Sequence, residues 1–156
     1  MDEAFGFADD EASHIDGIWW SWGQGQTAAY PSNVLPLYDR DKYRQWVKQG
    51  IDVARLYLEA TKRHGLEAFF SYRMNSADID LGTRADVPIK DDHPEWTIQH
   101  WQDHPELKDV IWLNFGFQKV RDYKLKVLRE AAENYDFDGM ELDLQHVPVH
   151  FPVGHQ

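Results

Sequence analysis

The sequence lacks cysteine entirely, and it is poor in positive charge. Without a thiol, the 156-residue chain can form no disulfide, no thiolate metal site and no cysteine nucleophile. Its 16 lysines and arginines are outnumbered by 27 aspartates and glutamates, which leaves a formal net charge of −11 at pH 7. Because phosphate backbones and anionic membranes are bound through clustered basic residues, we expect neither nucleic acid nor a membrane as a partner.

The chain also lacks a long hydrophobic run. Residues 17–38 carry no charge, but glycine, proline, glutamine and asparagine interrupt them, so they predict a broken polar loop rather than a membrane span. The first residues are acidic where a secretion signal would be basic. The expected location is therefore secreted or periplasmic if a longer parent chain carries a signal, and cytoplasmic otherwise.

Strand and helix patterns alternate along the chain. Short apolar runs predict strands at 14–20, 66–72, 110–115 and 137–144. Helical periodicity and helix-ending residues predict helices from Asp39 or Asp41 to His64, at about 92–101 and at about 118–135. This alternation predicts an α/β fold with a parallel sheet and right-handed crossovers.

The connections between these elements differ in length. Helices lead into strands almost directly at Gly65 and Asp136, whereas strands lead into helices through long loops. Parallel α/β proteins with this asymmetry carry their sites at the carboxyl ends of the strands. No G-x-G-x-x-G, P-loop or G-x-S-x-G motif follows a predicted strand, so we expect neither a nucleotide cofactor nor a serine triad.

Two histidine pairs and one acidic loop resemble parts of metal sites. His100 and His104 are four residues apart, as are His146 and His150, but neither pair has the glutamate and third ligand of a helical zinc site. The segment 78–82 is similar to the start of a calcium loop but lacks the terminal glutamate. We therefore predict no metal and no other cofactor.

The last predicted strand carries the best candidate for catalysis. Side chains alternate along a strand, so Glu141, Asp143 and Gln145 share one face, while the apolar residues between them share the face that packs under helices. Two carboxylates this close raise the pKa of one of them, which is what a general acid needs. The alternative is that Glu141 or Asp143 pairs with an arginine and only stabilises the sheet.

Tryptophan is the unusually abundant residue, with seven copies beside seven tyrosines and eight phenylalanines. Trp20 and Trp22 point the same way from the end of the first strand, and Trp19 points the opposite way. Exposed aromatic side chains at strand ends are typical of sugar-binding sites, so Trp20 and Trp22 are candidates for substrate binding. Burial in the core is the equal alternative for both, and we expect Trp19 in the core.

Polar side chains close the other strands. The substrate-binding set that we predict from them is Tyr72, Arg73, Asn75, Asn114, Gln145 and His146. Arg73 and Asn75 can hydrogen-bond sugar hydroxyls or a substrate carboxylate. The alternative for Arg73, Asn75 and Asn114 is that they anchor loops.

Several segments together resemble a known family. They read WWSWG at 19–23, YPS at 30–32, FSYRMN at 70–75, RDYK at 121–124 and DGMELD at 138–143. In this order they are similar to the glycoside hydrolases with a (β/α)8, or TIM, barrel, in particular to an uncharacterised polysaccharide-associated group. The resemblance implies that residues 14–156 form about four strand–helix units, the N-terminal half of a barrel, after a flexible acidic lead-in at 1–13.

The resemblance also implies a role for the carboxylates. In many of these hydrolases the acid/base residue ends strand four, which places Glu141 or Asp143 in that role; the best-known version has Asn before the Glu, where this chain has Met140. The strand is similar in part to the chitinase-like motif D-G-x-D-x-D-x-E, in which Gln145 takes the place of the catalytic Glu. That alignment implies an inactive or reworked site.

The function that these observations favour is a glycoside hydrolase acting on a poly- or oligosaccharide by carboxylate acid/base catalysis. The alternatives are a non-catalytic carbohydrate-binding or pseudoenzyme barrel, and a small α/β interaction domain. Complete barrels have about 250 residues, and four strands leave an open sheet edge. We expect a missing C-terminal half or a homo-oligomeric partner to cover that edge.

Overall fold

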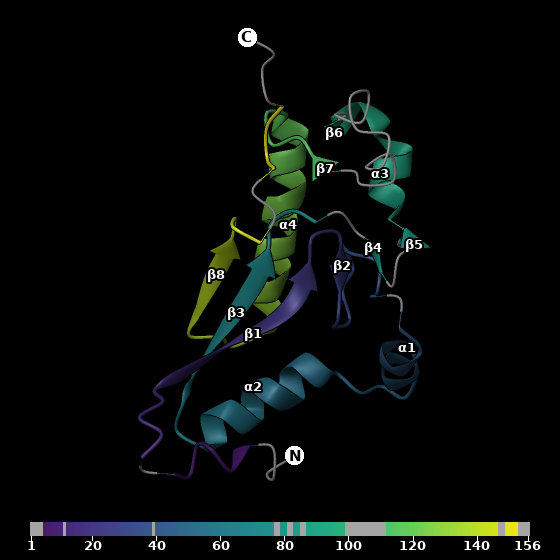
Figure 1. Ribbon diagram of the computed structural model, residues 1–156. Helices are drawn as coiled ribbons and strands as arrows, with labels where there is room; N and C mark the ends of the chain where they lie inside the picture. Colours follow the sequence, from purple (N-terminus) through teal and green to yellow (C-terminus); the bar gives the residue numbers. More distant parts are fainter. Residues whose placement is uncertain are drawn as a thin grey trace.

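In the computed structural model, the chain is an α/β protein built on a parallel sheet, as the sequence predicts (Figure 1). The structure describes residues 5–10, 12–38, 40–76, 79–80, 83–84, 87–98, 112–146 and 149–152. The parallel strands are β1 (Gly17–Gln24), β3 (Glu67–Arg73) and β8 (Gly139–Asp143), and β2 (Thr27–Ala28) pairs antiparallel with β1. The sheet order is β2-β1-β3-β8.

The helix expected up to residue 64 is divided into α1 (Asp41–Lys48) and α2 (Val53–Arg63). Gly50, with φ +72°, ends α1 in a left-handed turn, and the backbone N–H of Ile51 returns to the Trp46 carbonyl at 2.8 Å. The Asp52 side chain then caps α2 by accepting a hydrogen bond from the Arg55 N–H at 3.1 Å. Helical periodicity therefore located both helices but missed the break between them.

The prediction for 110–115 is wrong as a strand of the parallel sheet. In its described part, 112–115, the strand is β7 (Trp112–Leu113), which pairs antiparallel with β6 (Thr97–Ile98). The next two backbone N–H groups, of Asn114 and Phe115, bond to the Trp96 and His150 carbonyls at 2.7 and 2.8 Å, so they join loops rather than a ladder. A short apolar run does not by itself identify its partner strand.

The excursion between β3 and α4 (Gln118–Asn134) contains β7 and several other short elements. They are β4 (Ile79–Asp80), β5 (Thr83–Arg84), α3 (Pro88–Asp92) and the 3-10 turn η2 (Pro94–Trp96). In Figure 1, α3, β6 and β7 lie beyond the arrowheads of β1 and β3. Because β3 pairs directly with β8, Glu141 lies on the third parallel strand of the described residues, not on a fourth.

The two faces of the sheet differ in what packs against them. The covered face carries Trp20, Ala68, Phe70, Tyr72 and Met140, and its contacts are with α2, α4 and the segment that follows β2. Ala68, Phe70 and Tyr72 are all 0% exposed. The open face carries Trp19, Ser21, Phe69, Ser71, Arg73, Glu141 and Asp143. Trp19 is 54% exposed there.

The last strand follows the predicted alternation only in part. Met140 packs against the core, but Leu142 and Leu144 are 46% and 45% exposed. No described helix follows β8 to cover them. Among the helices that the structure describes, none has the length and apolar character needed to cross a membrane.

Candidate functional site

The carboxyl ends of the three parallel strands form one rim. Gln24, Arg73 and Asp143 are paired across β1, β3 and β8, and we call these three residues the carboxyl rim. Ser71 and Glu141 pair one step below it on the same face. Neighbouring strands are about 4.8 Å apart, so Arg73, Glu141 and Asp143 are brought together as the sequence predicts.

Glu141 is the exposed carboxylate of this group. Its side chain makes no hydrogen bond or ion pair with any other described residue. Arg73 is half-buried, and its guanidinium likewise has no hydrogen-bond or ion-pair partner among the residues described. The alternative in which an arginine neutralises Glu141 or Asp143 is therefore not seen in this part of the chain.

Asp143 has a second, local task. Its Oδ1 accepts the backbone N–H groups of Gln145 and His146 at 2.9 and 2.8 Å, which fixes the turn that follows β8. The Asp143 carbonyl accepts the Met74 N–H at 3.0 Å and ties this turn to the end of β3. Gln145 and His146 are exposed on that turn, next to the carboxyl rim.

Asn75 and Asn114, predicted to bind substrate, are loop anchors in the structure. Asn75 is 1% exposed, and its Nδ2 donates to the carbonyls of Leu113 and Val149 at 2.9 and 2.8 Å. Its Oδ1 accepts the Leu113 N–H at 3.2 Å, so its amide is used within the protein. The Asn114 Oδ1 accepts the Gly116 N–H at 2.9 Å in the turn before α4. The loop-anchoring alternative accounts for both.

The aromatic candidates are also placed differently from the sugar-binding prediction. Trp20 donates its indole N–H to the Thr61 hydroxyl of α2 at 2.9 Å and packs edge-on against Tyr57. Trp22 is 7% exposed and packs against the same tyrosine. Both belong to the packing between β1 and α2, so the core alternative holds for them. A register irregularity between Ser21 and Gly23 accompanies this arrangement.

Trp19 shows the opposite error. It was expected in the core, but it lies on the open face with its ring stacked on Phe69 at a centroid distance of 4.6 Å. Glycines make room for the Phe69 ring, because a Cβ atom at Gly139 would come within 2.9 Å of it and one at Gly17 within 3.2 Å. The helices pack on the other side of β1, which is why Trp20 is covered and Trp19 is not.

Tyr72, predicted to bind substrate, belongs instead to a buried polar cluster behind the rim, and the part that Lys124 plays in this cluster was missed by sequence reasoning. Tyr72, at 0% exposed, donates its hydroxyl to the Gly25 carbonyl at 2.5 Å. The Lys124 ammonium, on α4 and 1% exposed, donates to the same carbonyl at 2.6 Å and to the Tyr72 hydroxyl at 2.9 Å. It also donates to the Gln26 side-chain carbonyl. The available signal was a lysine at an apolar position of a helical repeat.

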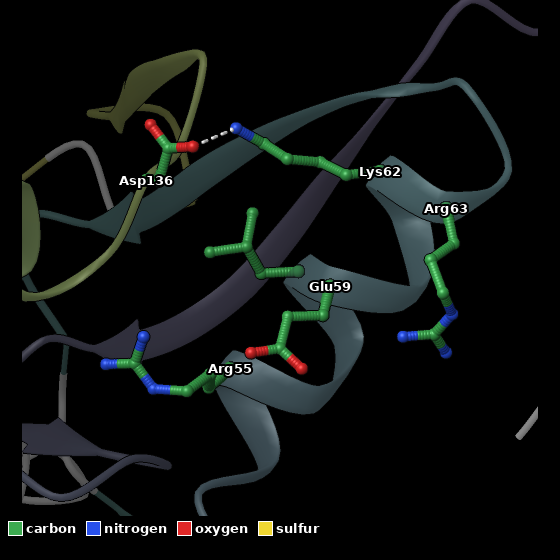
Figure 2. Close-up of a pocket in the computed structure, with 6 residues that line it drawn as sticks. Arg55, Glu59, Lys62, Arg63 and Asp136 are labelled. Atoms are coloured by element: carbon green, nitrogen blue, oxygen red, sulfur yellow. Dashed lines mark hydrogen bonds and ion pairs between the residues drawn. The ribbon is translucent and has the colours of Figure 1, made fainter.

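A hollow of about 580 Å³ lies far from this rim, at the amino ends of β3 and β8. It is lined by Arg55, Leu58, Glu59, Lys62, Arg63 and Asp136. Figure 2 shows Lys62 reaching from α2 to Asp136, an ion pair with an N–O distance of 2.8 Å, while Arg63 points away. Sites of parallel α/β proteins lie at the opposite ends of the strands, so this hollow is not our candidate site.

The described residues contain no group of three or more His, Asp or Glu side chains that could hold a metal ion. His146 is exposed on the turn after β8. His150 lies within hydrogen-bonding distance of the Leu144 carbonyl, 3.0 Å from its Nε2, and packs edge-on against Phe115. The predicted pair His100 and His104 lies outside the residues that the structure describes.

The fold and the site define an α/β protein with two acidic side chains and one arginine, Arg73, on the open face of a parallel sheet. Comparison with family models matches residues 11–154 to the family described as glycosyl hydrolase-like 10. The chain therefore belongs to the glycosyl hydrolase-like 10 family, which confirms the resemblance found in the sequence. It is also similar to the glycosyl hydrolase YngK of Bacillus subtilis (strain 168), with 25% identity over 119 residues. That match covers 74% of this chain and 22% of YngK, so the chain spans about a fifth of that relative.

Proposed function

We propose that this chain contributes the carboxyl rim of a glycoside hydrolase that acts on a poly- or oligosaccharide. Membership of a glycosyl hydrolase-like family supports a carbohydrate ligand. The observation that carries the proposal is the register that places Glu141, Asp143 and Arg73 on one uncovered face at the carboxyl ends of parallel strands. This is the end of the sheet where such folds carry their chemistry.

In the proposed reaction, Glu141 is the general acid/base. Its exposed carboxyl group, which has no partner among the described residues, can reach a glycosidic oxygen and give it a proton as the bond to the sugar breaks. Glycoside hydrolysis by this route uses a second carboxyl group as nucleophile or as base toward water. Asp143 is the candidate for this second carboxyl group. Its Oδ1 accepts the hydrogen bonds that fix the turn, and its Oδ2 takes no part in them.

The remaining rim residues are proposed to bind the sugar. The Arg73 guanidinium, which has no hydrogen-bond or ion-pair partner among the described residues, can donate several hydrogen bonds to hydroxyls or to a carboxylate of the substrate. Gln145 and His146 are exposed beside it, on the turn that Asp143 holds. No cofactor takes part in this scheme, because proton transfer and water are sufficient for the hydrolysis.

The direct test replaces Glu141 by Gln and Asp143 by Asn, singly and together, in the full-length protein. A panel of poly- and oligosaccharides is assayed for new reducing ends. We expect Glu141→Gln to lower the rate by roughly 10²–10⁴-fold, the usual contribution of a positioned acid or base. Unchanged hydrolysis of every responsive glycan by the double variant would overturn the assignment.

A non-catalytic carbohydrate-binding role is the second candidate. It is favoured by Gln145, an amide at a position where a chitinase-like motif has the catalytic acid, and by the turn-fixing task of Asp143. This role predicts binding on a glycan array without release of reducing ends. It also predicts that the wild type and Glu141→Gln alike release no reducing ends.

We further propose that more strands complete a (β/α)8 barrel over the open face. The exposure of Leu142 and Leu144 at β8, and of Trp19 on the open face, supports this closure. A second copy of the chain is the alternative cover for the β8 edge. A small, self-contained α/β interaction domain predicts instead a stable monomer of these 156 residues, which light scattering after gel filtration can detect.

A further inference from the structure

The buried cluster behind the carboxyl rim joins parts of the chain that are far apart in sequence. We define the Lys124 cluster as Gly25, Gln26, Tyr72, Asn75 and Lys124. Its members come from the β1–β2 turn, the end of β3, the segment after β3, and α4. The Gln26 and Asn75 side chains meet at 3.5 Å, and Asn75 continues to the carbonyls of Leu113 and Val149.

The cluster is connected to the rim through the backbone of Gly25. The Gly25 carbonyl receives two buried donors, the Tyr72 hydroxyl at 2.5 Å and the Lys124 ammonium at 2.6 Å. The Gly25 N–H donates to the Arg73 carbonyl at 2.9 Å, and Gln24 directly precedes it. With φ at +62°, Gly25 makes the turn that brings these groups together. Movement of this turn therefore either moves Gln24 or breaks the hydrogen bond from the Gly25 N–H to the Arg73 carbonyl.

Packing alone does not explain a lysine at this position. Lys124 falls in the buried stripe of α4 with Val120, Val127 and Ala131, where an apolar side chain would continue the core. Burial of an ammonium group is costly unless hydrogen bonds compensate for the lost water. Lys124 has three N–H donors, and Gly25, Gln26 and Tyr72 offer it an acceptor each.

We infer that Lys124 is a positioning residue for the carboxyl rim. By holding the Gly25–Gln26 turn against Tyr72, it sets where Gln24 and Arg73 stand beside Asp143. The inference rests on the proposed function for the identity of the ligand. The positioning itself is a property of this chain and is measured without any ligand.

The first measurement is hydrogen–deuterium exchange of the full-length protein with Lys124→Met, which keeps the length of the stem and removes the charge. Lys126→Met is the matched control, because Lys126 is exposed two residues further along the same helix. We expect exchange to become about tenfold faster or more in peptides covering 24–28 and 73–76, where local opening becomes easier. Exchange elsewhere, and everywhere in Lys126→Met, should stay unchanged.

The second measurement is the kinetics of both variants on whichever polysaccharide of the panel the wild type hydrolyses. A displaced rim is expected to raise KM about tenfold, with a smaller change in kcat, because the proposed role of Arg73 is to bind the sugar rather than to transfer a proton. If the wild type neither hydrolyses nor binds any glycan of the panel, the proposed function fails. The exchange experiment still decides the role of Lys124 in that case.

Tyr72→Phe serves as a second variant, since it removes only the hydroxyl that shares the Gly25 carbonyl with Lys124. If Lys124→Met does not fold, Tyr72→Phe tests whether the cluster positions the rim. Faster exchange confined to 24–28 and 73–76 supports the positioning role in either variant. Unchanged exchange at these peptides, or faster exchange spread evenly over the molecule, overturns it.

Discussion

Phe69 and Phe70 are neighbours on β3, yet they show how different the two faces of the sheet are. Phe70 is 0% exposed and is surrounded by aromatic side chains. The centroid of its ring lies 5.9 Å from that of Tyr30 and 5.4 Å from that of Phe137. Phe69 lies on the open face, half-buried, and stacks on the 54% exposed Trp19. The covered face carries the buried core residues, and the open face carries the carboxylates that we propose for catalysis. The alternation of side chains along one strand thus separates the packed residues from the proposed site.

The largest expected effect is on the covered face. Phe70→Ala should lower the free energy of unfolding by about 3–5 kcal/mol, because it leaves a cavity in a closely packed aromatic cluster. Phe69→Ala, the matched change one residue earlier, should cost clearly less, since its ring is partly in water. Chemical denaturation of both variants measures the difference. An equal loss for Phe69→Ala would show that further parts of the protein cover the open face.

A glycine pair gives a second, smaller contrast. A Cβ atom at Gly23 would lie 2.2 Å from the buried Tyr72 ring, and one at Gly139 would lie 2.9 Å from the Phe69 ring. Gly23→Ala should destabilise the protein by about 1–3 kcal/mol, as overpacking does in a filled core. Gly139→Ala should have less effect, because the half-exposed Phe69 ring can move. Thermal melts that rank the two variants in the reverse order would contradict this view of the faces.

Alkaline pH should weaken the covered side selectively. Burial raises the pKa of the Tyr135 hydroxyl, and the Asp52 carboxylate that accepts its hydrogen bond at 2.8 Å raises it further. Above the ordinary tyrosine pKa of 10.0, the unfolded chain loses this proton while the folded chain keeps it. The contribution to stability is complete below that pH. It then falls by at most about 1.4 kcal/mol per pH unit until the pH reaches the raised value.

Tyr135→Phe is the variant that isolates this effect. It should flatten the loss of stability between pH 10 and 11 in denaturant titrations, although the wild type keeps further alkaline sensitivity from other groups. One is Lys62, whose pKa is raised by its hydrogen bond to Asp136. Another is Tyr30, whose pKa burial raises. An identical pH dependence in Tyr135→Phe and in the wild type would refute the assignment.

The smallest effect is expected outside both faces, at the hollow of Figure 2. Asp136→Asn removes the closer of the two carboxylates that pair with Lys62, the other being Asp138 at 3.6 Å. The Asp136 side chain is 94% exposed and that of Lys62 is 32% exposed. Water and salt screen such a pair, so the change in unfolding free energy should be below about 1 kcal/mol and should shrink as salt is added. A loss of several kcal/mol would mean that this end of the sheet is better packed than the open face.

Much of the fold follows from sequence patterns. The alternation of apolar runs and helical stripes predicted the parallel α/β architecture, and Gly65 marked the end of α2, where it adopts φ +72°. Alternation on the last strand put Glu141 and Asp143 on one face, as the register confirms. These features are local, because they depend on the period of side chains along a single element.

The errors arose where a property depends on a partner distant in sequence. Trp19 and Trp20 are chemically alike, and only the side on which α2 packs leaves Trp19 exposed while Trp20 is partly buried against the core. For Asn75 the sequence left sugar binding and loop anchoring open, and the hydrogen bonds from its Nδ2 to the Leu113 and Val149 carbonyls favour anchoring. The apolar run at 110–115 could not reveal that its residues Trp112 and Leu113 pair with β6 rather than β3.

The sequence by itself determined the class of fold and the carboxylate pair on its strand, because the period of side chains is written along the chain. The family came from the resemblance of short segments to known hydrolases, and the match of residues 11–154 to the family model confirmed it. The tertiary structure alone decided which aromatic residues are core, that Glu141 lies on the third parallel strand described, and that a buried lysine binds the Gly25 carbonyl behind the rim. These depend on register and helix packing, which bring together residues that are far apart in sequence. Lys124 and Gly25, 99 positions apart, are the clearest case.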